Sequence, residues 1–258
     1  MPIKEDHPVL NTPQDNISIW RYMDIPSFIA LLVNKSLTFV RFDLFEDGYE
    51  GKLPKMTALA IDANIRQKIK KGKLLPKYWN LSEILNNGIR DTYINCWCKE
   101  NHEMVHMWKI YSKENGVAIQ TDYKNLKQSV NTEETVYPSE VSYVDFDNDI
   151  VNWKSNTLSF FTIKRQEYKS ENEFRLIVSN PKSVENELRC HNNPNKITRS
   201  IRESLYMKTP VIMCSVDPSI LISKIYVSPY APPWYYNLIV DIMKKFDLQE
   251  KEVIQSEL

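Results

Sequence analysis

The chain has 258 residues, of which 42% are hydrophobic and 26% are charged, a composition typical of a globular protein with a sizeable core. Its 33 basic and 33 acidic residues balance, which excludes a strong overall attraction to nucleic acid or anionic lipid. Its five glycines form neither a G-x-G-x-x-G turn, nor a P-loop, nor a G-x-S-x-G elbow, which argues against a Rossmann dehydrogenase, a P-loop NTPase and an α/β-hydrolase.

The N-terminal half alternates strand and helix signals. Residues 1–16 are polar and punctuated by proline, which predicts a flexible arm ahead of a single domain over 17–258. Apolar spacing and turn residues predict strands at 18–23, 36–42 and 92–98, and helices at 25–34, about 57–73 and 80–88. Asp24 is a suitable N-cap for the first helix, and Gly88 is expected to end the third.

The C-terminal half contains most of the predicted strands. They are expected at 116–121, 134–144 with a bend at Pro138, 171–178, 210–216, 223–229 and, as an edge strand, 251–258. Helices are expected at 101–111, about 149–168 and 233–246, and a polar insertion or loop at about 179–208. The whole pattern predicts an α+β fold with a mixed central sheet and surrounding helices.

Three features predict a cytoplasmic protein. No apolar run approaches the length of a membrane span, and the first residues, MPIKEDHPVL, lack the core of a signal peptide. The four cysteines form no disulfide-scaffold spacing, which suits a reducing compartment.

The segment NHEMVHMWKIY at 101–111 contains the zinc-peptidase pattern H-E-x-x-H. On a helix, His102 and His106 would lie one turn apart, with a glutamate beside them for general-base chemistry. A zinc site needs a third ligand, and no recognisable ligand motif follows downstream. Cys96 and Cys98 offer a rival ligand set with the same histidines. A zinc-dependent hydrolase is therefore one alternative, and a helix with histidines beside its polar face is the simpler interpretation.

Three motifs, in order, resemble a bacterial family known as domain-of-unknown-function family 2971. The first is WRYM, a helix, SLTF and the turn FEDGYEG, in which Asp47 and Glu50 match although the family's Asn-Asp-Pro is Glu-Asp-Gly here. The second is INCWCKENHEMVHMWKIYSKENGVAIQTDYKNL, with matching residues Met107, Trp108, Tyr111, Gly116 and Val117. The third is KRQEYKSENEFRLIV, with matching residues Lys164, Tyr168, Glu171, Glu173 and Arg175. The resemblance covers about residues 18–180, without the HEMVH histidines.

More distantly, an arginine on the first strand, a hydroxyl on the second and a later E-x-E motif resemble the ADP-ribosyltransferase superfamily. There a split sheet holds NAD, an arginine clamps its phosphate or ribose, and a glutamate stabilises the charge that develops as nicotinamide leaves. The resemblance implies these roles here: Arg21 as the clamp, Ser36 or Thr38 as the hydroxyl, Glu173 as the catalytic carboxylate, Glu171 as the second acid, Arg175 in the same polar cleft, and Tyr22, Trp108 and Tyr111 as stacking residues. It also suggests a role as a toxin or in phage defence.

These site residues also have simpler interpretations. Glu171, Glu173 and Arg175 would share one strand face in a solvated salt-bridge ladder as well. Trp108 and Tyr111, spaced i and i+3, would also suit core packing.

The sequence thus favours an NAD-dependent ADP-ribosyltransferase-like enzyme with an unknown acceptor. A non-catalytic module that binds nucleic acid or protein is the alternative from another functional class. Its candidate surface is the basic run from Arg66 to Lys73, which is otherwise the solvated end of a helix.

Overall fold

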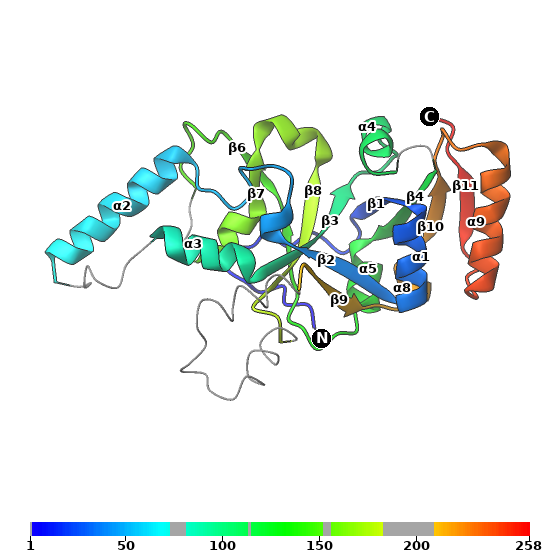
Figure 1. The fold of residues 1–258 in the computed structure, drawn as a ribbon, viewed down its shortest axis with the longest axis horizontal. Coiled ribbons are helices and arrows are strands. Elements are labelled where there is room, and N and C mark those ends of the chain that lie inside the picture. The colour runs from blue at the N-terminus through cyan, green and yellow to red at the C-terminus, as the bar shows by residue number, and fades with distance from the viewer. Residues whose placement is uncertain (1, 73–80, 113–114, 152–155, 183–208) are drawn as a thin grey trace.

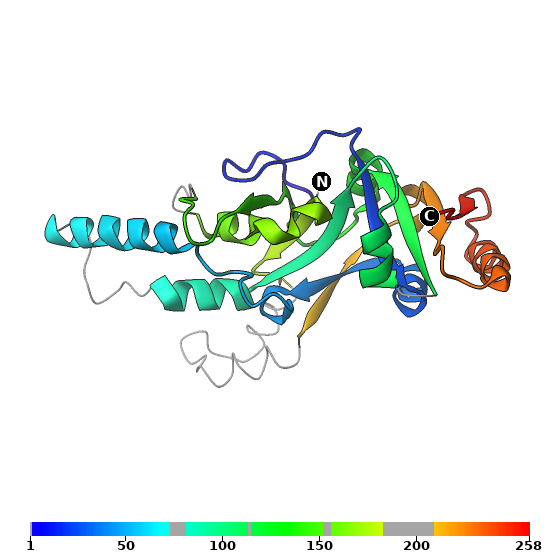
Figure 2. The ribbon, with the colours of Figure 1, turned by 90° about the horizontal axis from the view of Figure 1, so that it is seen from above.

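The structure is a computed structural model that describes residues 2–72, 81–112, 115–151, 156–182 and 209–258. It has an α+β fold with a mixed sheet, as the sequence predicts (Figure 1). The molecule is elongated: helix α2 (Lys55–Lys70) projects from one end, and helix α9 (Pro233–Lys245) lies at the other (Figures 1 and 2).

Nine of the described strands form the main sheet, in the order β11-β10-β4-β1-β3-β2-β9, with β8 paired to β3 and β5 paired to β8. Their bounds are β1 Ser18–Asp24, β2 Ser36–Arg41, β3 Thr92–Lys99, β4 Gly116–Asp122, β5 Tyr137–Glu140, β8 Glu173–Ser179, β9 Val211–Ser215, β10 Lys224–Val227 and β11 Glu252–Gln255. The pair β10–β11 is parallel and the other pairs are antiparallel. A separate parallel pair joins β6 (Ser142–Val144) to β7 (Ile163–Arg165).

The sheet divides at β3. Cys98 pairs with Trp20 of β1 on one side and with Glu173 of β8 on the other. Tyr93, nearer the start of β3, pairs with β2 on one side and again with β8 on the other. Since β8 occupies one edge throughout, β1 and β2 share the opposite edge and diverge from each other along it. The β3 backbone between these two pairings therefore faces a split.

The other described elements are helices α1 (Ile25–Asn34), α3 (Leu81–Arg90), α4 (Val105–Met107), α5 (Tyr123–Ser129) and α8 (Pro218–Leu221), the π-helix η3 (Trp108–Ser112), and the 3-10 helices η1 (Phe42–Leu44), η4 (Thr157–Thr162) and η5 (Gln166–Glu171). Helix α1 has the predicted bounds because the Asp24 side chain accepts a hydrogen bond from the Ser27 N–H at 2.9 Å. Among the described helices, none combines the length and apolar character that a bilayer span requires.

The two faces of β8 separate the core from the polar site. Phe174, Leu176 and Val178 join the largest apolar cluster, which also contains Phe28 and Leu32 of α1. On the alternate positions, Glu173 and Arg175 lie on the opposite face, as the strand periodicity predicts. These charged residues are nevertheless buried, so they do not form a solvated ladder.

The N-terminal segment packs against the domain, although its composition predicts a flexible arm. Ile3 is buried and forms a parallel bridge with Val136. Glu5 accepts hydrogen bonds from the Tyr123 hydroxyl at 2.9 Å and from Lys127 Nζ at 3.0 Å. One apolar anchor and two polar contacts therefore order a segment that has few apolar residues.

Several predicted boundaries are wrong for local reasons. The region expected to be a helix at 149–168 contains η4, β7 and η5, because Leu158, Phe160 and Phe161 are all buried and do not follow a helical stripe. Helix α3 continues two residues past Gly88. The strand expected at 134–144 is interrupted at Val141, between β5 and β6, rather than at Pro138. Most of the predicted insertion, 183–208, lies outside the described residues.

Candidate functional site

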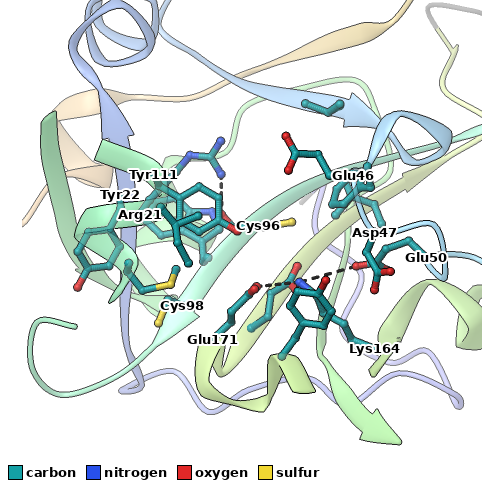
Figure 3. Close-up of a pocket in the computed structure, with 18 of the residues that line it drawn as sticks. Arg21, Tyr22, Glu46, Asp47, Glu50, Cys96, Cys98, Tyr111, Lys164 and Glu171 are labelled. Carbon is teal, nitrogen blue, oxygen red and sulfur yellow. Dashed lines mark hydrogen bonds and ion pairs between the residues drawn. The ribbon is translucent and has the colours of Figure 1, made fainter. Parts of the chain in front are cut away.

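A cavity of about 540 Å³ lies at the split in the sheet (Figure 3). Its walls come from β1, β2, β3, β7, β8, α4, η3, η5, and from η1 with the turn after it, so distant segments of the chain meet there. The carboxylates that line it are Glu46, Asp47, Glu50, Glu171 and Glu173, and the cationic side chains are Arg21 and Lys164. Five of the seven charged side chains that line the cavity are therefore carboxylates, and their counter-ions include two arginines outside the lining, Arg165 and Arg175.

Arg175 forms the centre of a buried ion-pair network beneath the cavity. Its guanidinium donates two hydrogen bonds to the two Glu50 oxygens, at 2.7 and 3.1 Å. Its Nε and Nη2 donate to the two Glu173 oxygens at 2.7 and 3.1 Å, and its Nη1 also reaches the Phe161 carbonyl at 2.8 Å. The guanidinium is fully buried. Such a fork with all its donors engaged fixes the two glutamates in place.

Lys164 links the same network to Glu171. Its ammonium donates to Glu171 Oε2 at 2.7 Å and to Glu173 Oε2 at 3.1 Å, and it lies 3.8 Å from Glu50 Oε1. Lys164 comes from the short strand β7 and Glu171 from the last position of η5, so the 3-10 turn between them brings the pair together. Three carboxylates thus share two cations, Lys164 and Arg175.

Burial and pairing act in opposite directions on the ionisation of this network. Burial alone raises the pKa of Glu173, but the charges of Arg175 and Lys164 outweigh it and lower the pKa to about 2. For Glu50 burial dominates over Arg175, and the pKa is raised. Burial lowers the pKa of Lys164, but the charge of Glu173 and the contact with Glu171 outweigh it, so the pKa is raised. Glu173 and Lys164 therefore stay charged at neutral pH.

Arg21 lies at the split itself. Its Nη1 donates to the Cys96 carbonyl at 2.6 Å, a group on the stretch of β3 between the pairings with β1 and β2 (Figure 3). The Asn95 side chain similarly donates to the Thr38 carbonyl of β2 at 2.8 Å. Among the described residues no carboxylate forms an ion pair with Arg21, and burial lowers its pKa. Arg21 therefore supplies positive charge to the cavity wall in addition to its contact with the backbone.

An aromatic wall stands on the β1 and η3 side of the cavity. The Tyr22 and Trp108 rings meet edge to face with centroids 5.0 Å apart. The Tyr22 hydroxyl accepts a hydrogen bond from the Met104 N–H at 2.9 Å, and Trp108 Nε1 donates to Glu103 at 3.0 Å. Tyr111, one turn beyond Trp108, lines the cavity and is 45% exposed, so its ring is available to a ligand.

The structure brings six of the predicted site residues to this cavity: Arg21, Tyr22, Thr38, Tyr111, Glu171 and Glu173. Three others do not line it. Ser36 is buried at the start of β2, Trp108 is fully buried behind Tyr22, and Arg175 is buried in the ion-pair network beneath the cavity. Trp108 and Arg175 therefore support the cavity from behind. Of the two hydroxyl candidates, Thr38 is the residue that lines the cavity, and its hydroxyl donates to Met213 Sδ at 3.4 Å.

The HEMVH segment does not have the geometry that a zinc peptidase requires. The helix begins at Val105, after His102, because Met104 is extended and its N–H bonds to the Tyr22 hydroxyl. His102 and His106 are therefore not one helical turn apart. Within the described part of the chain, no group of three or more His, Cys, Asp or Glu side chains is placed to hold a metal ion.

Two important residues of the network, Glu50 and Lys164, were given no site role by the sequence interpretation. Both occupy motif positions in the family resemblance, so the signal was present. Tyr168 and Cys96 also line the cavity, and Arg165 pairs with Asp47 at 3.1 Å beside it. Their place at the cavity becomes visible only in the folded structure, because the residues that meet there are far apart in the sequence.

Comparisons with protein-family models, with curated proteins and with solved structures find no match to this chain.

Proposed function

We propose that the cavity binds NAD and that the protein is an ADP-ribosyltransferase-like enzyme. The observation that carries this proposal is that Arg21 and the pair Glu171 and Glu173 line one cavity, at a split in the sheet. That is the arrangement which the resemblance to the superfamily implies. The resemblance to domain-of-unknown-function family 2971 and a role in toxicity or phage defence remain part of the same proposal.

The chemistry of the walls supports a ligand with a cationic ring. The nicotinamide ring of NAD is positively charged, and five carboxylates line the cavity. Three of them, Asp47, Glu50 and Glu173, are paired with Arg165 or Arg175 just outside the lining, whereas Glu171 keeps one oxygen free of protein donors among the described residues. Tyr111 and Tyr168 provide aromatic faces, which attract cations as well as flat rings. The volume falls within the range of roughly 300–1,000 Å³ that ligand pockets occupy.

In the proposed reaction the bond between the nicotinamide nitrogen and the ribose carbon breaks, and nicotinamide leaves with the electron pair. A fixed carboxylate stabilises the positive charge left on the ribose. The acceptor's nucleophile then bonds to that carbon and loses its proton to solvent or to a nearby base. Arg21 would hold a phosphate or ribose oxygen through the donors that Cys96 does not occupy.

Thermal unfolding with NAD and the release of nicotinamide test this proposal together. At about 100 times its Kd, NAD is expected to stabilise the fold by about 2.7 kcal/mol, a rise in Tm of roughly 5–10 °C. Tyr111→Ala should remove most of this rise. Tyr230→Ala is the matched control, because Tyr230 is 43% exposed and is not among the residues that line the cavity. No shift and no nicotinamide release in the presence of cell extract would contradict the proposal.

A nucleic-acid contact through α2 is the second candidate. The helix projects from the body of the molecule (Figure 1), and Arg66, Lys68, Lys70 and Lys71 near its end are exposed; Lys73 lies outside the described residues. Arg66 already pairs with Asp62 at 2.7 Å. In this case Lys68→Glu combined with Lys70→Glu would weaken oligonucleotide binding and reduce its salt dependence, without any effect of NAD.

A further inference from the structure

Two glutamates of the cavity, Glu171 and Glu173, differ in how many of their acceptor sites are occupied. A carboxylate has about four lone-pair sites for hydrogen bonds. Glu173 receives two N–H donors from Arg175 and one from Lys164, at 2.7, 3.1 and 3.1 Å. The Cys96 thiol adds a further hydrogen bond that helps to lower the Glu173 pKa. A ligand could bond to Glu173 only by displacing one of these partners.

Glu171 has most of its acceptor capacity free. Its Oε2 accepts from Lys164 at 2.7 Å, and none of the described residues donates to its Oε1. Its side chain is 11% exposed, against 5% for Glu173, and both line the cavity. Figure 3 shows Glu171 and Lys164 meeting at the edge of the cavity.

The backbone explains the difference between the two positions. Glu173 is the first residue of β8, in the sheet that forms the floor. Glu171 ends η5, and Asn172 after it adopts a left-handed conformation with φ 41° and ψ 53°. This turn takes Glu171 off the strand while leaving it in the cavity lining. Tyr111 and Glu171 both line the cavity. In agreement with this, the charge of Glu171 adds to burial in raising the pKa of Tyr111.

We propose that Glu171 is the carboxylate that contacts the ligand in this cavity and that Glu173 is a positioning residue. Arg175 holds Glu173, Glu173 binds Lys164, and Lys164 binds one oxygen of Glu171, so that the other oxygen faces the ligand. The assignment rests on the proposed function, and it reverses the roles that the E-x-E resemblance implies. In NAD turnover, the free oxygen of Glu171 would accept a hydrogen bond from a ribose hydroxyl and stabilise the developing positive charge.

Three variants test the assignment: Glu171→Gln, Glu173→Gln and the control Glu140→Gln. Glu140 also pairs with one lysine, Lys99 at 2.9 Å, but it is not among the residues that line the cavity. Each variant is assayed for Tm without ligand, and for kcat and KM of nicotinamide release from NAD. Glu171→Gln should lower kcat by about 100-fold or more, as for the loss of one transition-state contact, while its KM changes little. Its Tm should match that of Glu140→Gln.

Glu173→Gln should lower Tm by about 10 °C, because the buried cations Arg175 and Lys164 each lose one of their carboxylate partners. Assayed well below its Tm, it should keep kcat within about tenfold of the wild type, because Lys164 can still bind Glu171. The assignment is overturned if Glu171→Gln keeps wild-type kcat, or if Glu173→Gln folds normally and loses all turnover. If Glu173→Gln does not fold, the assignment depends on the kcat of Glu171→Gln: a drop of about 100-fold or more supports it, and a wild-type value overturns it.

The failure of the proposed function gives a different result. In that case the wild type neither releases nicotinamide nor gains Tm with NAD. The Tm values without ligand still test whether Glu173, and not Glu171, is the residue that the network depends on. That part of the assignment is overturned if Glu171→Gln lowers Tm as much as Glu173→Gln does.

Discussion

The two sides of the cavity are held together by different forces. The floor is a buried network of three carboxylates and two cations, in which Arg175 alone donates five hydrogen bonds. The opposite wall is an apolar cluster that contains Trp20, Tyr22, Met107 and Trp108, with ring contacts and a few single hydrogen bonds. The floor fixes the positions of charged groups, and the wall provides flat aromatic surfaces.

This difference shows what each side is suited to do. Burying charges costs desolvation energy that their attraction only partly returns, so an ionic floor is a poor way to gain stability. It is a good way to fix the positions of carboxylate oxygens, because each oxygen has directional donors. An aromatic wall gains stability from burial and still leaves one ring, Tyr111, open to solvent. Mutations in the two sides should therefore differ in how much free energy of unfolding they cost and in how that cost depends on pH.

The largest effect is expected for Arg175→Met in the floor. The substitution leaves Glu50 and Glu173 buried beside each other with Lys164 as their one remaining cation, at 3.8 and 3.1 Å. We expect a loss of about 5 kcal/mol in the free energy of unfolding, measured by urea denaturation. Adding Glu50→Gln should restore part of it, because one of the two carboxylates that then compete for Lys164 is removed.

Arg66→Met is the control for that experiment. Arg66 pairs with Asp62 on the exposed surface of α2, where an ion pair contributes about 0.5 kcal/mol or less. Similar losses in the two variants would mean that the floor is as well solvated as the surface, and the contrast between floor and wall would disappear.

Acid unfolding should isolate the contribution of Glu173. Its pKa is about 2 in the folded protein, below the 4.5 of an unperturbed glutamate. Its stabilising contribution is therefore complete above about pH 4.5 and is lost as the pH falls toward 2; the shift corresponds to on the order of 3 kcal/mol. Burial raises the pKa of Glu50, so Glu50 acts in the opposite sense and favours the folded state as the pH falls.

The measurement is urea denaturation of the wild type and of Glu173→Gln from pH 5 to pH 2.5. The wild type should lose more stability over this range than the variant does, by an amount that approaches the contribution above. Glu140→Gln, which keeps the floor intact, should follow the wild type. Parallel curves for all three proteins would show that Glu173 is not held ionised by the floor.

The sequence predicted the regular elements of the fold well, because their signals are local. The cap at Asp24 and the apolar stripe of Phe28, Leu31 and Leu32 define α1 with its observed bounds. The edge position of the last strand was also confirmed, since β11 lies at one end of the sheet order. Local signals failed where a distant residue decides the structure. Tyr22 binds the Met104 N–H and delays the helix in the HEMVH segment.

The candidate site was predictable in part, for the same reason. Motif positions identified Arg21 and Glu173, and the fold brings both to one cavity. The sequence could not distinguish Ser36 from Thr38, because both suit a strand; only the position of the split brings Thr38 to the cavity. Nor could it show that Arg175 is buried, since a solvated ladder has the same alternation.

On the aromatic side, Gly116→Ala should displace the π-helix. A Cβ atom at Gly116 would lie 2.1 Å from the Ser112 Cβ and 2.6 Å from its Cα and carbonyl oxygen, so backbone must move. We expect a loss of about 2–3 kcal/mol, typical of overpacking, measured by urea denaturation at pH 7. Because no charge is involved, the loss should stay the same at pH 5.

Gly88→Ala is the matched control for this substitution. The nearest atom to a Cβ there is in the Phe161 side chain at 3.5 Å, and the residue lies in helix α3. Alanine should therefore stabilise the protein slightly, by about 0.5–1 kcal/mol. If Gly116→Ala is as harmless as Gly88→Ala, η3 can move away from β4 at little cost in the free energy of unfolding. The expected close contact between η3 and β4 is then wrong.

The smallest effect is expected for Tyr22→Phe, which keeps the ring against Trp108 and removes only the hydroxyl. The Met104 N–H then loses its acceptor, at a cost of about 1–2 kcal/mol. Hydrogen exchange of the Met104 amide should quicken, and the start of the helix at Val105 should loosen. Tyr236→Phe is the control: its hydroxyl donates to the Val253 carbonyl at the sheet edge, where water can replace it. If the two variants lose the same stability, the wall depends on ring packing alone, and the Tyr22 hydroxyl does not set where the helix begins.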